Sequence, residues 1–210
     1  MVSFPDATWC MIVAPPNFSK MLPQLYRPEV MHWQWGIRRG EQLMAIVGLF
    51  PRTLLVLDAK LSVGGIGGVS NHQRLSRGSG HMRQLMHHCK DQMKRDGCHL
   101  GFLGGQRQRY AYYGFDRCGS QTNFSISLKN VQHRDNFPES RRTSSDYTAI
   151  AFETITAADA TRMARAEELY RSSAHLCRVD RGDIDEFALY LQSWNGVASA
   201  AIDESGAMVG

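Results

Sequence analysis

The chain contains few cysteines, and they form no recognisable pattern. The five cysteines are odd in number, widely scattered, and include no pair separated by two residues. This argues against a disulfide framework or a structural zinc site and favours a reducing compartment. We therefore expect a cytoplasmic protein without a metal. The cysteines are Cys10, Cys89, Cys98, Cys118 and Cys177.

Long apolar runs are also missing from the sequence. The longest run, LMAIVGLF at residues 43–50, is far too short to span a bilayer. The N-terminus has no basic segment followed by an apolar one, so we expect neither secretion nor a membrane partner. The 210 residues are nevertheless 43% hydrophobic, which is enough for a sizeable buried core.

Strong net charge of either sign is lacking as well. The formal net charge of +4 is mildly basic, which is too weak to indicate nucleic acid without a clustered face. The arginines and lysines of residues 74–109 are the only feature that favours a basic nucleic-acid-binding module, so nucleic acid ranks last among the partners that we consider.

The first half of the chain has the pattern of a mixed α/β domain. Residues 32–70 hold apolar and β-branched runs separated by RRGEQ and DAK, which predicts three antiparallel strands joined by hairpins. A helix should connect the strand at 61–70 to a short buried strand at 98–103, so these two strands should be parallel. The predicted buried face of that helix consists of Met82, Leu85, Met86, Cys89 and Met93.

The second half predicts a separate unit. Residues 106–114 indicate a brief helix and residues 121–128 an alternating strand, which would complete a domain over residues 1–130. Residues 131–147 are polar and without a period, as in a linker. Residues 148–210 predict a strand, two helices and a hairpin at the end of the chain.

The stretch RGSGHM at residues 77–82 lies between a glycine-rich strand and an amphipathic helix. The free N–H groups of a first helical turn, next to small residues that let an anion approach, form a phosphate site. A flexible helix cap is an equally simple interpretation. The stretch is neither a Walker loop nor the dinucleotide-binding glycine pattern, because its glycines have other spacings. The strand before it, LSVGGIGGVS, contains four glycines, which predicts a bulge or a close approach to its backbone.

At these residues the sequence resembles the GNAT superfamily of acetyl-CoA-dependent N-acetyltransferases. Their cofactor motif begins with Arg or Gln, has Gly three residues later, and has a small residue two positions after that Gly. Arg77 and Gly80 match the first two positions, whereas Met82 occupies the small-residue position. The segments GGIGGVSNH and LGGQRQRYAYYGF resemble the family's pantetheine-binding strand and its strand–helix ending. Together the three segments resemble the tandem-domain branch that includes the enhanced intracellular survival proteins. The resemblance covers about residues 32–130.

The resemblance implies a GNAT fold followed by a partial second GNAT-like unit in residues 148–210. The family's first strand and helix would be reduced to the proline-rich start, and the chain is expected to be a fragment at both ends. The implied reaction moves the acetyl group of acetyl-CoA to a primary amine, on a small molecule or a protein, by direct attack. The implied cofactor-binding residues are Gly68, Val69, Ser70, Arg77, Gly78, Ser79, Gly80, His81, Met82 and Gly105.

The resemblance also makes Tyr110 the general acid that protonates the departing thiolate, and a backbone N–H near Val69 or Ser70 the oxyanion donor. From the residues alone, a packing aromatic with a solvated hydroxyl is the preferred interpretation of Tyr110, and only the resemblance favours the acid. No general base stands out, and Asp58 and His72 are candidates only by proximity in sequence.

Other interpretations stay open at this point. The chain could be a catalytically inactive protein that still binds acetyl-CoA, as a relic or a sensor. The histidines His81, His87, His88 and His99 suggest a metal, but their helical spacing suits no single ion without a third ligand. The acceptor amine is not determined, and neither is the oligomeric state, for which a homo-oligomer is one option.

Overall fold

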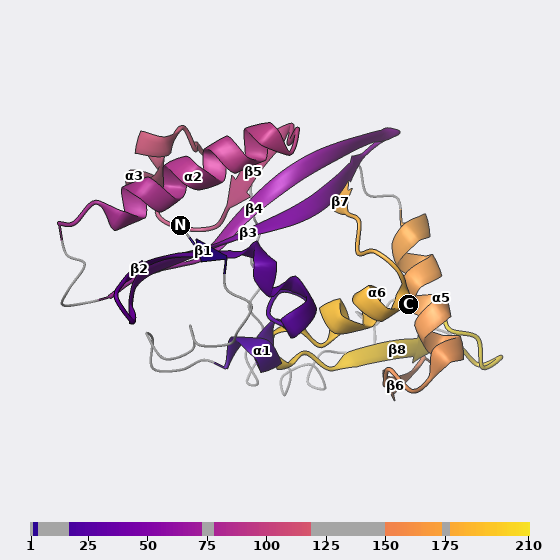
Figure 1. Cartoon of the computed structure of the whole chain (residues 1–210). Coiled ribbons are helices and arrows are strands. Elements are labelled where there is room, and N and C mark those ends of the chain that lie inside the picture. Colours follow the sequence, from indigo (N-terminus) through magenta and orange to yellow (C-terminus); the bar gives the residue numbers. More distant parts are fainter. Residues whose placement is uncertain (1, 4–16, 73–77, 119–149, 174–176) are drawn as a thin grey trace, which may run out of the picture.

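The computed structural model describes residues 2–3, 17–72, 78–118, 150–173 and 177–210 (Figure 1). The N-terminal elements are β1 (Val2–Ser3), α1 (Phe18–Met21), the 3-10 helix η2 (Pro28–Trp33), β2 (Gln34–Arg39), β3 (Gln42–Val56), β4 (Ala59–Asn71), α2 (His81–Arg95), β5 (Leu100–Leu103), α3 (Arg107–Tyr110) and the 3-10 helix η3 (Ala111–Tyr113). The C-terminal elements are β6 (Ala151–Ile155), α5 (Ala160–Ser172), β7 (Cys177–Val179), α6 (Ile184–Leu191), the 3-10 helix η6 (Ser193–Asn195) and β8 (Ala198–Ile202).

A mixed sheet of order β1-β2-β3-β4-β5 forms the centre of the molecule. Strands β2, β3 and β4 are an antiparallel meander, and β4 pairs with β5 in parallel from Val63 opposite Leu100 to Ile66 opposite Leu103. The predicted mixed α/β fold, with three hairpin-connected strands and a helical crossover, is confirmed.

Helix α2 covers one face of this sheet (Figure 1). Its apolar positions recur every three or four residues, so they form one stripe that faces the strands. The buried cluster beneath the helix consists of Ala45, Val47, Leu49, Ile66, Leu85, Met86, Cys89 and Met93, and Met82 packs against it. The helical face predicted from the sequence is therefore the face that is buried.

The proline-rich segment before β2 packs on the opposite face. Tyr26 and Met31 are buried there with Ile46 and Phe50 of β3. The ring of Tyr26 stacks on Phe18 and meets the edge of Phe50. Segment 17–33 therefore supplies the second core of the domain, although its regular structure is limited to α1 and η2.

The strand predicted at 98–103 forms, but the prediction that it is buried is wrong. Strand β5 forms, but Leu100 and Phe102 are 49% and 66% exposed. Alternate side chains of a strand face opposite sides of the sheet. Gly101 and Leu103 face α2, whereas Leu100 and Phe102 face a side that no element covers within the described part of the chain. The strand expected at 121–128 and the linker at 131–147 lie outside the described residues.

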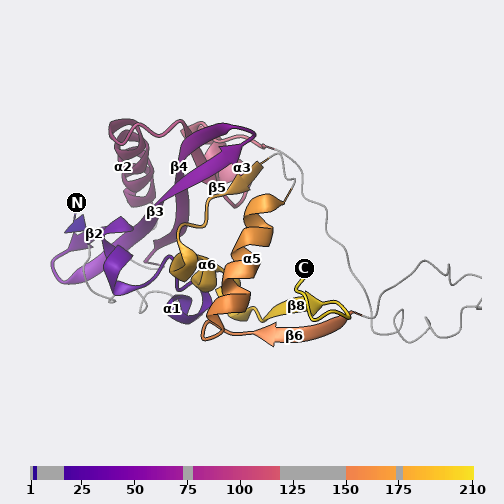
Figure 2. The same ribbon diagram turned by 90° about the vertical axis from the view of Figure 1, so that its right-hand side faces the viewer.

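The C-terminal residues form the predicted strand, two helices and hairpin. Strands β6 and β8 pair antiparallel, and α5 and α6 lie beside them (Figure 2). Helix α5 begins at an Asp159 cap and α6 at an Asp183 cap, each of which accepts a backbone N–H of the first turn. Strand β7 leaves this unit and pairs antiparallel with Leu54–Val56 of β3, so residues from both halves share one sheet. No described helix is both long and apolar enough to cross a membrane.

Candidate active site

Strand β4 contains a bulge within its glycine-rich run. Ile46 pairs with Ser70 and Gly48 with Gly67, so Val47 on β3 faces both Gly68 and Val69 on β4. Gly68 has a φ of 60°, in the left-handed region that favours glycine at a bulge. Of the two explanations for these glycines, the structure shows the bulge directly.

The same stretch of β4 has an open edge. Its parallel pairing with β5 stops at Ile66, while β4 continues to Asn71. Among the described residues, positions 67–71 therefore have a strand neighbour on the β3 side only. Backbone groups on such an edge are available to an extended ligand that lies along the strand.

The N-terminus of α2 follows the carboxyl end of β4. Gly78 and Gly80 have φ values of 74° and 75°, and the space beside Gly78, where a Cβ would project, is empty. Gly80 is the cap of α2 and gives no side-chain hydrogen bond to the first turn. The N-terminus of a helix favours anions in general. Ser79 Oγ and His81 Nδ1 lie 2.8 Å apart.

The other residues of the predicted cofactor motif differ in position. Met82, which occupies the family's small-residue position, packs its side chain against the core beneath α2. Arg77 lies outside the described residues.

Tyr110 ends α3, just beyond the carboxyl end of β5. Its ring lies against Gly105, where a Cβ would come within 2.8 Å of the ring. Tyr110 also lines a cavity of about 580 Å³ together with β5 residues and the segment after η3. Tyr113 packs against the core, whereas Tyr112 is 89% exposed. The carboxyl ends of parallel β4 and β5 lie at one edge of the sheet, so the bulge, the α2 N-terminus and α3 all belong to that edge.

Two other candidates from the sequence have clear positions. Asp58 is wrong as a general base for chemistry at the bulge, because it lies in the turn before β4, ten residues from Gly68, or about 30 Å along an extended strand. His72 directly follows β4, and its N–H donates to the Met44 carbonyl. Within the described residues, no three His, Cys, Asp or Glu side chains gather as a metal site.

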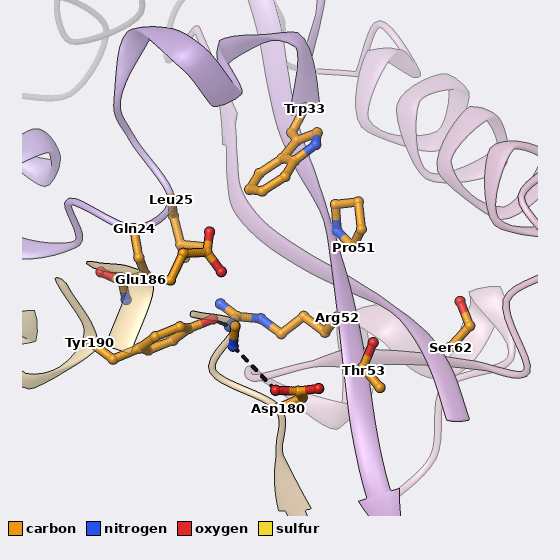
Figure 3. Close-up of a pocket in the computed structure, with 11 residues that line it drawn as sticks. Gln24, Leu25, Trp33, Pro51, Arg52, Thr53, Ser62, Asp180, Glu186 and Tyr190 are labelled. Atoms are coloured by element: carbon orange, nitrogen blue, oxygen red, sulfur yellow. Dashed lines mark hydrogen bonds between the residues drawn. The ribbon is translucent and has the colours of Figure 1, made fainter. Parts of the chain in front are cut away.

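A second pocket lies between β3 and the C-terminal unit (Figure 3). Its volume is about 280 Å³, and Arg52 extends from β3 to donate to the hydroxyl of Tyr190 on α6. Glu186 and Asp180 lie on either side of this guanidinium (Figure 3). Burial lowers the pKa of Arg52, and the charge of Glu186 partly opposes this shift.

Tyr26 approaches the bulge from the face opposite α2. Its hydroxyl lies 2.8 Å from the position that a Cβ on Gly68 would occupy. Burial raises the pKa of Tyr26 to about 12, so its phenol is neutral at physiological pH. Sequence analysis missed Tyr26 and the whole second pocket, because neither has a local motif and both arise from packing between distant segments.

Residues 15–118 match a family described as the acetyltransferase (GNAT) domain. This stretch of the chain is therefore similar to GNAT acetyltransferase domains, a class of acyltransferase domain that uses acetyl-CoA. No curated protein matches the chain.

The fold is also similar to solved structures. A probable N-acyltransferase from Enterococcus faecalis V583 has a TM-score of 0.58 at 14% identity over 83% of this chain and 42% of its own. A GCN5-related N-acetyltransferase from Kribbella flavida has a TM-score of 0.47 at 15% identity, over 84% of this chain and 46% of its own. The chain thus spans less than half the length of either protein.

Proposed function

We propose that this protein is an N-acetyltransferase that moves the acetyl group of acetyl-CoA to a primary amine by direct attack. The observation that carries the proposal is the bulged, open-edged end of β4, followed by the glycine-capped N-terminus of α2. These two features support the proposal because a pantetheine arm can lie along an open strand edge and a pyrophosphate can bind at a helix N-terminus.

In the proposed reaction, a backbone N–H near Val69 or Ser70 stabilises the oxyanion as the amine nitrogen attacks the thioester carbon. The C–N bond forms, the C–S bond breaks, and the thiolate takes a proton from the hydroxyl of Tyr110. The nitrogen gives its own proton to water, and water reprotonates Tyr110. Arg77 lies beside the pyrophosphate in this proposal. The other residues that hold the acetyl-CoA are Gly68, Gly78, Ser79, Gly80, His81, Met82 and Gly105.

We also propose that residues 131–147 are a linker between a GNAT domain over residues 1–130 and a partial second GNAT-like unit over residues 148–210. We further propose that the protein is related to the tandem-domain branch of the family. A second candidate function is an acetyl-CoA-binding relic or sensor without turnover. The observation that favours it is the position of Asp58, which leaves the bulge without the only carboxylate that the sequence offered as a base.

Calorimetry with acetyl-CoA, followed by thiol release with a panel of amines, tests these alternatives. We expect acetyl-CoA binding together with thiol release. Acetyl-CoA binding without thiol release would favour the relic or sensor, and no heat of binding would argue against both candidate functions. A nucleic-acid module would instead bind duplex DNA with a steep dependence on salt.

A matched pair of variants locates the cofactor site. Gly78→Asp places a carboxylate where we place the pyrophosphate, so acetyl-CoA affinity should fall about tenfold or more. Gly97→Asp, beyond the other end of α2, has a similar φ of 67° and equally open surroundings. It should keep the affinity, and equal losses in the two variants would argue against a site at the α2 N-terminus.

A further inference from the structure

The left-handed residue of the β4 bulge has no side chain to hold it in place. Gly68 has a φ of 60°, and glycine has more backbone freedom than any other residue. The peptide group that follows Gly68 carries the N–H of Val69, so the two dihedral angles of Gly68 decide where that N–H points. A group outside β4 must therefore fix this glycine if the Val69 N–H is to keep one direction.

The hydroxyl of Tyr26 occupies the place where a side chain of Gly68 would begin. A Cβ on Gly68 would lie 2.8 Å from the Tyr26 oxygen and 3.9 Å from the Tyr26 Cζ. Only the first of these distances is too short for ordinary van der Waals contact, so the oxygen fills the space beside the Gly68 Cα. The phenol therefore limits the movement of Gly68 as a side chain of its own would.

Tyr26 is itself held by its neighbours. It is 5% exposed, its ring stacks on Phe18 with 5.3 Å between centroids, and it meets the edge of Phe50 at 5.7 Å. Phe50 in turn lies on Gly67, where a Cβ would be 3.1 Å from Phe50 Cε2. Close-packed aromatic rings have few alternative positions. The two rings cover the bulge on the face opposite α2, so Tyr26 acts on the site through Gly68.

We propose that Tyr26 is a positioning residue for the oxyanion donor. Its hydroxyl fixes Gly68, and Gly68 aims the Val69 N–H at the thioester oxygen of bound acetyl-CoA. The position matters because such a donor acts at about 2.7–3.1 Å, and a misplacement of about 1 Å can cost roughly 10²-fold in rate. The positioning role rests on the proposed function, whereas the contact between Tyr26 and Gly68 does not.

A double-mutant cycle tests the contact without any catalysis. Gly68→Ala should lower the midpoint of urea unfolding more in the unchanged protein than in Tyr26→Phe, where the added Cβ meets Cζ at 3.9 Å and no oxygen. The cycle removes the effect of every other contact of the hydroxyl. Gly40→Ala, at a left-handed position with open space, should shift the midpoint equally in both backgrounds. The same result for Gly68→Ala would overturn the inference.

Tyr26→Phe separates positioning from stability in the catalysed reaction. With acetyl-CoA and butylamine, kcat should fall about tenfold or more while the Kd for acetyl-CoA stays within a few-fold. Tyr170→Phe is the control, because it removes a partly buried hydroxyl that donates to the Val179 carbonyl at 2.6 Å in the C-terminal unit, and it should keep kcat. An unchanged kcat in Tyr26→Phe would remove the positioning role and leave the proposed function standing.

The pH dependence of kcat distinguishes positioning from proton transfer. Burial raises the pKa of Tyr26 to about 12, so its phenol stays neutral at physiological pH. Tyr26→Phe should therefore lower kcat by the same factor at every assay pH. A loss that varies with pH would make Tyr26 a proton carrier and contradict the positioning role.

The carbonyl stretch of bound acetyl-CoA gives a readout that needs no turnover. Its infrared frequency, identified by an isotopic label on the thioester carbon, falls when an N–H donates to the carbonyl oxygen. This downward shift should be smaller in Tyr26→Phe than in the unchanged protein and in Tyr170→Phe. A smaller shift without thiol release from any amine would support the role of Tyr26 while the proposed function fails. Equal shifts in the three proteins would overturn the inference.

Discussion

Single residues decide what chemistry this sheet edge can perform. Tyr110 is held by its ring against Gly105 and by its place at the end of α3, and its hydroxyl makes no hydrogen bond to another described residue. Arg52 is similar in the second pocket, where the Tyr190 hydroxyl is the acceptor that its guanidinium finds among the described residues. Both side chains have fixed positions and polar groups available to a ligand.

Tyr110→Phe removes only the phenolic oxygen. If Tyr110 is the general acid, the variant should lose about 10²–10⁴-fold in kcat while its affinity for acetyl-CoA stays within a few-fold. Steady-state thiol release and calorimetry measure the two quantities. Tyr112→Phe is the control, because Tyr112 is two residues away and almost fully exposed. Unchanged turnover in Tyr110→Phe would remove Tyr110 from the mechanism.

Among the elements, β4 combines structural and functional demands. A strand with several glycines gains little from side-chain packing, and Gly64 and Gly67 instead let Met93 and Phe50 lie directly on the backbone. At Gly68 the bulge adds a left-handed residue under the Tyr26 hydroxyl. Neighbouring side chains stabilise β4, and its residues 67–71 have no described strand neighbour on the β5 side.

Gly68→Ala tests how strongly the bulge is constrained. A left-handed alanine costs about 1–2 kcal/mol, and the added Cβ would meet the Tyr26 hydroxyl at 2.8 Å. Gly40→Ala is the control, since Gly40 has a φ of 58° but open space around it. Urea unfolding should show a larger loss for Gly68→Ala by about 1 kcal/mol or more. Equal losses in the free energy of unfolding would mean that the Tyr26 side chain moves away from the added Cβ with no loss of stability.

At the scale of the whole molecule, the two halves of the chain are joined through β3. Its first part pairs with β2 and its last part with β7. The Asp180 N–H donates to the Thr53 carbonyl, and Arg27 pairs with Glu186. The pocket at Arg52 exists only because the C-terminal unit contributes Asp180, Glu186 and Tyr190 to it.

Arg178→Pro should loosen this junction. The Asp180 N–H donates to the Thr53 carbonyl, and hydrogen-bonded pairs alternate along an antiparallel ladder. The next hydrogen-bonded pair is therefore Arg178 opposite Leu55. A proline at position 178 would remove the N–H that this pair needs. Hydrogen exchange should accelerate about tenfold or more at β7 and at Leu54–Val56, with little change in α2. Arg178→Ala keeps the N–H and controls for the side chain. Unchanged exchange at Leu54–Val56 would show that β7 does not stabilise the end of β3.

The amino-acid sequence alone determined the meander, the buried face of α2 and the position of RGSG between a strand and a helix. These features follow from local periodicity and turn residues, which act over a few positions of the chain. The tertiary structure alone decided that Leu100 and Phe102 are exposed, that Asp58 lies at the far end of β4, and that Arg52 and Asp180 line one pocket. Burial and proximity depend on which distant segments pack together, and no local pattern specifies the partner.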